Sequence, residues 1–246
     1  MGARAQTSEK PTTLTFALPS GQTARVRFTA AADGDFALGQ PADVLVPRRR
    51  ALVPLPWTWL HQVHGNRVAI VDEPGAQAGA HADAAGTARP GAALAIQTAD
   101  CAPVARVADE GLVAAVHVGW RGLTAGVVEA AADTLRPTGG SRLRAVVGPC
   151  IHACCYEFGV GDLDRVAARY GDGVRATTRS GRTALDMAAA VTSALAAIPN
   201  AEVTFASPAC TACGTPAMFS HRARGDAGRQ AMVVWLEGET SEPIRR

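Results

Sequence analysis

Two patterns of apolar residues alternate along the chain: one is typical of strands and the other of helices. Continuous or every-second apolar positions predict strands over residues 12–18, 24–29, 68–71, 92–98, 103–107, 112–118, 144–147, 203–206 and 232–236. Helical spacing predicts a helix from an N-cap at Thr124 to about Leu135, where Pro137 stops it, and further helices over 163–170 and 184–198. Strands and helices mixed throughout indicate a single α+β (mixed α/β) domain.

The composition excludes several classes of protein. The formal net charge is only +2 and aromatic residues make up 5% of the chain, which argues against a dedicated nucleic-acid surface. The one basic block, residues 48–50 in the weakly patterned stretch 31–58, is interpreted as a solvated turn, with a phosphate contact as the alternative. No apolar run reaches the roughly 18 residues of a membrane span.

Residues 1–10 are polar and lack the apolar core of a signal peptide, so we expect a loose tail before a catalytic domain spanning 11–246. The expected location is the cytoplasm, where thiols stay reduced. The six cysteines are therefore interpreted as buried packing, metal ligands or reactive thiols before disulfides.

Three short segments carry candidate chemistry: His61-Gln-Val-His64-Gly65, Thr98-Ala-Asp-Cys101 and His117-Val-Gly-Trp-Arg-Gly122. His64, Cys101 and His117 offer two imidazoles and a thiolate, a mixture that zinc binds, and three protein ligands with an open fourth position are typical of catalytic zinc. Period two places His61 and His64 on opposite faces of an extended segment, so His61 is not counted as a ligand. For each residue alone, a buried thiol or a structural histidine is the competing interpretation.

Other residues leave alternatives open. Arg121 lies in the glycine-flanked turn Gly119-Trp120-Arg121-Gly122 before a predicted helix, a setting suited to binding a phosphate or carboxylate, although an ion pair with a nearby acid explains it equally well. Cys150, Cys154-Cys155 and Cys210-x-x-Cys213 together suggest a four-sulfur zinc site. Only the last pair has suitable spacing, however, so we expect buried thiols near the pocket instead.

Ten short motifs occur in family order: Gln-Val-His-Gly at 62–65, Ala-Asp at 82–83, Thr-Ala-Asp-Cys-x-Pro-Val at 98–104, His-x-Gly-Trp-Arg-Gly at 117–122, Gly-Pro-Cys-Ile at 148–151, Cys-Cys-Tyr-Glu at 154–157, Leu-Asp at 185–186, Cys-Thr at 210–211, Phe-Ser-His-Arg at 219–222 and Gly-Arg at 228–229. From about residue 60 onward the chain resembles the bacterial YfiH/YlmD family, also called the multicopper polyphenol oxidase (laccase-domain) or peptidoglycan editing factor family. Segments 30–40 and 46–50 depart from the family's usual opening, and His61 and Cys213 lie outside its signature.

The resemblance implies two sheets flanked by helices, similar to the deamidating necrotizing toxins, and a metal held by His64, Cys101 and His117. It also implies zinc-dependent phosphorolysis of adenosine, inosine and methylthioadenosine, and hydrolytic deamination of adenosine. For such an enzyme we expect Cys101, His117 and Asp100 to be catalytic, and Arg121 and Arg222 to bind phosphate. The expected partners are a small-molecule nucleoside and phosphate, with no nucleic acid and no membrane, and the chain is expected to be a monomer or a homodimer.

Three other functions compete with this one. Cys101 can act as a nucleophile with His117 as its base, which makes an amide hydrolase that edits peptidoglycan precursors. The same residues can hold copper, but a multicopper oxidase needs several further histidines, and the chain has six in all without any His-x-His pair. A metal-binding or partner-binding module without catalysis leaves Arg121 unexplained.

Overall fold

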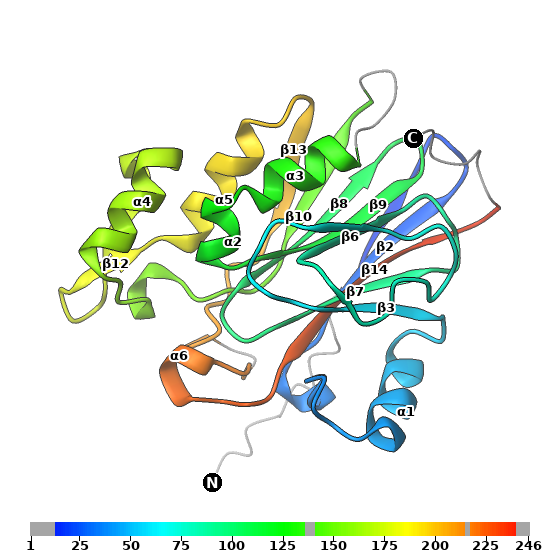
Figure 1. The fold of residues 1–246 in the computed structure, drawn as a ribbon, viewed down its shortest axis with the longest axis horizontal. Coiled ribbons are helices and arrows are strands. Elements are labelled where there is room, and N and C mark those ends of the chain that lie inside the picture. The colour runs from blue at the N-terminus through cyan, green and yellow to red at the C-terminus, as the bar shows by residue number, and fades with distance from the viewer. Residues whose placement is uncertain (1–12, 136–140, 215–216, 240–246) are drawn as a thin grey trace, which may run out of the picture.

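Two six-stranded mixed sheets form the centre of the molecule (Figure 1). The computed structural model describes residues 13–135, 141–214 and 217–239, so the tail predicted over residues 1–10 lies outside it. The first sheet has the strand order β1 (Thr13–Ala17), β2 (Thr23–Phe28), β14 (Gln230–Glu237), β7 (Ala93–Thr98), β3 (Trp57–His61) and β5 (Ala80–His81). The second has the order β13 (Ala201–Ala206), β10 (Leu143–Val147), β8 (Ala102–Ala108), β9 (Leu112–Val118), β6 (Ala84–Thr87) and β4 (Val68–Ile70).

Helices cover the outer faces of the two sheets. The second sheet carries α2 (Trp120–Thr124), α3 (Val127–Thr134), α4 (Val160–Tyr170) and α5 (Met187–Ala196), and α1 (Ala42–Leu52) lies beside the first sheet (Figure 1). The short α6 (His221–Arg224) precedes β14, and a separate hairpin pairs β11 (Arg175–Thr177) with β12 (Thr183–Leu185). None of the helices in these described ranges is long and apolar enough to cross a membrane.

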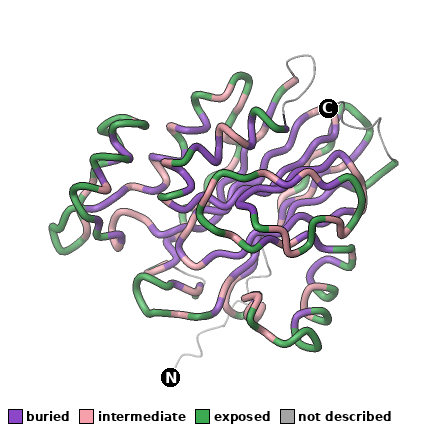
Figure 2. The backbone as a smooth tube through the Cα atoms, viewed as in Figure 1, coloured by how far each residue is buried: buried purple, intermediate pink, exposed green. Residues whose placement is uncertain are grey.

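The core has layers on both sides of each sheet. Side chains such as Leu94, Ile96 and Val107 fill the space between the sheets, while Val104 and Val118 pack under the helices. Because both faces are covered, every residue of β7, β8 and β9 is buried (Figure 2). This explains why these strands have continuous apolar runs in the sequence, and the predicted α+β fold with two sheets flanked by helices is confirmed.

Most of the predicted elements are present, but three interpretations are wrong. Thr124 does not cap a helix: its hydroxyl donates to the carbonyl of Arg121 at 2.9 Å, within the last turn of α2. Gly126, at φ 83°, then separates α2 from α3, because that backbone conformation ends one helix before the next begins. Pro137 lies outside the described residues.

The predicted helix over 184–198 begins later than expected. Residues 183–185 form β12, and Asp186 caps α5 by accepting a hydrogen bond from the Ala189 amide at 2.9 Å. The basic block at 48–50 is not a turn but the end of α1, where the Arg49 guanidinium lies over the rings of Trp57 and Trp59. The strand β3, which carries these two tryptophans, was not predicted.

Candidate metal and active site

Three potential metal ligands meet where strands of the two sheets end. His64 lies just beyond β3, Cys101 in the crossing from β7 to β8, and His117 near the end of β9. The ligand atoms of the three side chains all lie within 4.8 Å of one another. The two imidazole rings meet edge to face, with centroids 4.8 Å apart. The structure therefore brings together all three residues that the sequence predicts as ligands, and His61 is not among them.

The donor set fits a single tetrahedral ion. Zinc–nitrogen and zinc–sulfur bonds of about 2.0–2.1 and 2.3 Å place a nitrogen and a sulfur on one tetrahedral ion about 3.6 Å apart. The distance from His64 Nε2 to Cys101 Sγ is 3.8 Å. His117 is buried, Cys101 is half-buried and His64 is exposed, so the solvent side of the trio is free for a fourth ligand.

Asp83 orients two of these ligands from behind. Its Oδ1 accepts hydrogen bonds from His117 Nδ1 and the His64 amide, both at 2.9 Å, and its Oδ2 accepts from the amides of Gly65 and Val63 at 2.8 and 3.2 Å. The carboxylate has no exposed surface. Because the bond to Asp83 occupies Nδ1 of His117, the Nε2 lone pair of this ring is left to face Cys101.

The site favours charge separation between Cys101 and His117. Burial alone would raise the pKa of the Cys101 thiol, but the neighbouring His117 and His64 rings outweigh it and lower that pKa to about 6. Burial would lower the pKa of His117, but Cys101 and Asp83 outweigh it and raise the pKa to about 9. Both pKa shifts favour a thiolate–imidazolium pair at neutral pH in the metal-free protein.

Close backbone approach on the far side of the trio requires a glycine. A Cβ added at Gly119 would lie 2.7 Å from Cδ2 of His64 and 3.0 Å from Sγ of Cys101. Any larger residue would therefore push the imidazole or the thiolate out of place. Gly119 is also the N-cap of α2, the helix that begins two residues after the end of the His117-Val118 segment and carries Arg121.

Asp100, predicted to be catalytic, is held by the protein itself. Its Oδ1 accepts from the hydroxyls of Thr211 and Ser220 at 2.7 and 2.6 Å, and its Oδ2 accepts from the Arg222 amide at 2.6 Å. Its backbone has φ 97°, an unusual conformation for a residue other than glycine. On this geometry we propose that Asp100 positions the neighbouring Cys101 rather than contacting substrate.

A cleft of about 720 Å³ is lined by two members of the trio, His64 and His117, and by Arg121, His221 and Arg229, among others. This volume suits a small-molecule ligand. The Arg121 guanidinium lies over the Trp120 ring, 4.4 Å from its centroid. Ala37 and Leu38 also line the cleft, so the segment that departs from the family pattern does contribute to it.

Arg222 is turned away from this cleft. Its guanidinium donates to the Glu157 carbonyl at 2.7 Å and lies over the Tyr156 ring, 4.9 Å from its centroid. Arg229, and not Arg222, lies on the cleft wall, and its Nη1 donates to the carbonyls of residues 226, 227 and 228. Arg222 is thus better suited to tie loops together than to bind phosphate.

Two residues of this site were not singled out by the sequence interpretation. Asp83 and Arg229 both lie within the recognised motifs, but no role was assigned to either of them. The signal for Asp83 was an acid between apolar residues, since a buried carboxylate must be hydrogen-bonded or paired. No comparable local signal marks Arg229, which precedes β14 and lies on the same cleft wall as Arg121 only in the folded structure.

Fold and site together define an α+β protein with a His/Cys/His candidate metal site whose two histidines line a ligand-sized cleft. The chain belongs to the family described as multi-copper polyphenol oxidoreductase laccase, whose model matches residues 39–237. The structure of YfiH from Bacillus licheniformis has the same fold, with a TM-score of 0.74 and 24% identity, covering 93% of this chain and 98% of that one.

Two relatives have curated names that state an activity. A purine nucleoside phosphorylase of Mycobacterium tuberculosis is 37% identical over 212 residues, covering 83% of this chain and 84% of the relative. A purine nucleoside phosphorylase of Streptomyces griseus is 40% identical over 225 residues, covering 85% and 90%. These similarities confirm the family resemblance and identify the chain as an enzyme of this family.

Proposed function

We propose that this protein is a zinc-dependent purine nucleoside phosphorylase acting on adenosine, inosine and methylthioadenosine. The observation that carries the proposal is the His64/Cys101/His117 trio, whose two histidines line a cleft with Arg121 and Arg229 on its wall. The curated names of relatives 37% and 40% identical to the chain support the same activity. The reducing cytoplasm suits a site that needs a free Cys101 thiolate.

In phosphorolysis a phosphate oxygen bonds to C1′ of the ribose while the glycosidic bond to N9 breaks, and the departing base takes up a proton. Arg121 and Arg229 would hold the phosphate, since guanidinium groups bind its oxygens in pairs. Asp83 holds the His117 ring through Nδ1, so Nε2 is the ring nitrogen left for the metal. When bound, zinc supplies Lewis acidity toward a group that enters its open position.

We further propose that the same site deaminates adenosine by hydrolysis, as the family resemblance implies. The adenine ring would then enter with C6 toward the trio, whereas phosphorolysis needs C1′ near Arg121. The cleft volume of about 720 Å³ leaves room for a nucleoside in either orientation. Which reaction is faster depends on whether phosphate occupies the arginine side of the cleft.

The test is to incubate zinc-loaded protein with adenosine, with and without phosphate, and to separate the products. Adenine and ribose 1-phosphate formed only with phosphate support phosphorolysis, and inosine formed in either case supports deamination. An Arg121→Met variant should raise the KM for phosphate about 10- to 100-fold, the loss expected for charge-assisted hydrogen bonds. Arg165→Met, an exposed substitution on α4 paired with Asp162, is the matched control.

No product from any purine nucleoside, with zinc bound at the trio, would contradict the proposal. Copper can occupy the same donors, so a copper-loaded sample offered a phenolic substrate gives a second control. Oxidation of the phenol by that sample, without nucleoside turnover by the zinc form, would favour the oxidase function instead.

A second candidate function is an amide hydrolase with Cys101 as nucleophile. One observation favours it: Cys101, His117 and Asp83 form a relay in which the carboxylate orients the imidazole and the imidazole faces a thiolate of lowered pKa. This function needs no metal. Chelator-treated protein that hydrolyses amide substrates, and that loses this activity when Cys101 is alkylated, would support it over the zinc enzyme.

A further inference from the structure

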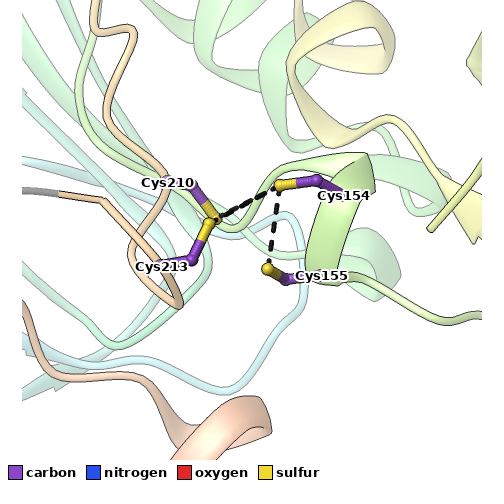
Figure 3. Close-up of side chains that lie close together, drawn as sticks. All are labelled: Cys154, Cys155, Cys210 and Cys213. Carbon is purple, nitrogen blue, oxygen red and sulfur yellow. Dashed lines mark hydrogen bonds between the residues drawn. The ribbon is translucent and has the colours of Figure 1, made fainter. Parts of the chain in front are cut away.

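A second cluster of cysteines lies outside the His/Cys/His trio. The sulfurs of Cys154, Cys155, Cys210 and Cys213 lie within 4.8 Å of one another (Figure 3). Cys154 Sγ is 3.7 Å from the sulfurs of Cys155 and Cys213 and 4.0 Å from that of Cys210. Cys150, which the sequence grouped with them, is buried and forms a backbone bridge with Cys210, but its sulfur is not part of the cluster.

We propose that Cys154, Cys155, Cys210 and Cys213 form a structural zinc site, separate from the active site. Four thiolates around one tetrahedral zinc, at bonds of about 2.3 Å, lie about 3.8 Å apart. The three distances from the Cys154 sulfur to the others, 3.7, 3.7 and 4.0 Å, match that spacing. The cluster is thus already arranged at the size of a single metal ion.

The spacing does not fit disulfides. A disulfide needs sulfurs about 2.05 Å apart, and all six cysteines are free. Nor does the cluster suit simple packing, because Cys213 is exposed and only Cys210 is buried. The expectation of buried thiols is therefore wrong for three of these four cysteines.

Local structure explains how an adjacent pair can share one ion. Cys154 and Cys155 lie in the 3₁₀ turn Ala153–Cys155, and both side chains extend toward the loop that carries Cys210 and Cys213 (Figure 3). The other loop carries Cys210-x-x-Cys213, a usual zinc-binding spacing. The adjacent pair looked unsuitable because spacing along the chain does not show how a tight turn directs two neighbouring sulfurs.

Donors around the cluster suit a negatively charged metal–thiolate group. The His152 amide donates to the Cys210 sulfur at 3.4 Å, and the amides of Ala212 and Cys213 also donate to it. The Arg224 guanidinium donates to the carbonyls of Ala212 and Thr211 at 3.0 and 3.4 Å, which places a cation beside this loop. Four thiolates and one Zn²⁺ carry two net negative charges, which these groups stabilise.

The site would join two loops that support the active site. Cys210 precedes Thr211, whose hydroxyl holds Asp100, and the Thr211 amide donates to the Cys150 carbonyl at 3.0 Å. Ile151 donates its amide to the Asp100 carbonyl at 2.9 Å. A metal that ties the loop of Cys154 to that of Cys210 would therefore fix the surroundings of Asp100 and, through it, of Cys101. This proposal does not depend on the proposed function, because it concerns different ligands.

The experiment measures metal content of the full chain, purified under reducing conditions with zinc present. We expect about two zinc ions per wild-type chain and about one in either Cys213→Ser or His117→Ala, since each variant removes one site. Cys150→Ala, a cysteine outside the cluster, is the matched control and should keep about two. A Cys154→Ser variant tests the same site from the other loop, which carries Cys154 and Cys155.

Cobalt substitution distinguishes the two sites without relying on activity. Intense sulfur-to-cobalt absorption, as expected for four thiolates, should persist in His117→Ala and fall in Cys213→Ser to the weaker absorption of a site with the single thiolate of Cys101. In the wild-type protein, bound zinc should protect the four thiols from alkylation, and a chelator should expose them, a readout that needs no variant.

Three results would overturn the proposal. One is a single zinc per wild-type chain that is lost in His117→Ala and kept in Cys213→Ser. Another is iron in place of zinc in the cluster, since a thiolate set of this kind also accepts iron. The third is a disulfide within the cluster in protein purified with reductant. Failure of the nucleoside assay would leave all of these measurements unaffected, so the two proposals fail separately.

Discussion

Replacing Asp83 with Asn tests how the metal ligands are held. The carboxylate accepts four hydrogen bonds, two at each oxygen, from His117 Nδ1 and from the amides of three loop residues. An amide side chain of the same shape offers one acceptor and one donor group. Whichever way the substituted side chain lies, two of the four donors then face an N–H₂ group.

The expected magnitude follows from those two lost bonds. Hydrogen bonds to a charged group contribute about 1.5–3 kcal/mol each, and part of this is offset because the neutral amide costs less to bury, so we expect unfolding free energy to fall by about 3 kcal/mol. Partners behind a metal ligand typically account for 10- to 100-fold in affinity, or about 1.4–2.7 kcal/mol. We therefore expect zinc binding at the trio to weaken by that factor in Asp83→Asn.

The two effects need separate assays. Urea unfolding of the metal-free protein gives the stability change, and the free zinc concentration that halves the rate of Cys101 alkylation gives the affinity of this site alone. Asp186→Asn is the matched control, because Asp186 accepts one amide at the N-cap of α5 and asparagine caps helices equally well. Unchanged zinc affinity in Asp83→Asn, with Asp186→Asn also unchanged, would refute the argument that Asp83 orients the ligands.

Three further predictions follow from the same structure. Gly119→Ala should reduce zinc binding at the trio at least about 10-fold, because the added Cβ would meet His64 and Cys101. Gly161→Ala on α4 is the control and should not change zinc binding, because nothing lies within 4 Å of a Cβ added there. Equal zinc binding by the two variants would contradict this prediction. In metal-free protein the alkylation rate of Cys101 should rise with a midpoint at pH about 6, because the thiolate reacts and the pKa of this thiol is lowered to about 6. A midpoint of the alkylation rate near the ordinary thiol pKa of 9.0 would exclude the thiolate–imidazolium pair. Arg106 is 1% exposed with no hydrogen-bond partner for its guanidinium among the described residues, and burial lowers its pKa to about 10. Arg106→Met should raise the unfolding free energy by about 1–3 kcal/mol in urea titrations, while Arg144→Met, which removes the partner of Asp109, should lower it; a destabilised Arg106→Met would show that the charge is compensated.

The central strands were predictable because their signal is local. β7, β8 and β9 are buried on both faces, so their residues are apolar one after another and the runs stand out. By contrast, α1 and β3 were missed. In α1 the helical pattern is interrupted by Pro47 and followed by three arginines, and its stability depends on packing against the first sheet. Where α1 packs is determined by the arrangement of the strands of the first sheet, which the composition of α1 does not reveal.

The candidate site residues also divide into those with a local sequence signal and those that depend on tertiary packing. His64, Cys101 and His117 were identified because each lies in a short motif with glycine or proline nearby, and the order of the motifs matches a family. The role of Asp83 was not evident, since its partners come from β9 and from the loop after β3. The four-sulfur cluster was set aside because the adjacent cysteines have an unusual spacing, although the turn at 153–155 brings both sulfurs to one side.

The sequence by itself determined the fold class, the central strands and the three candidate ligand residues, because apolar periodicity and short motifs are properties of neighbouring positions. Only the tertiary structure decided which carboxylate supports His117, which arginines line the cleft and which four thiols meet. Those contacts join residues far apart in the chain. They exist only once two sheets pack face to face and their strand ends converge, and no local pattern encodes the distance between two such ends.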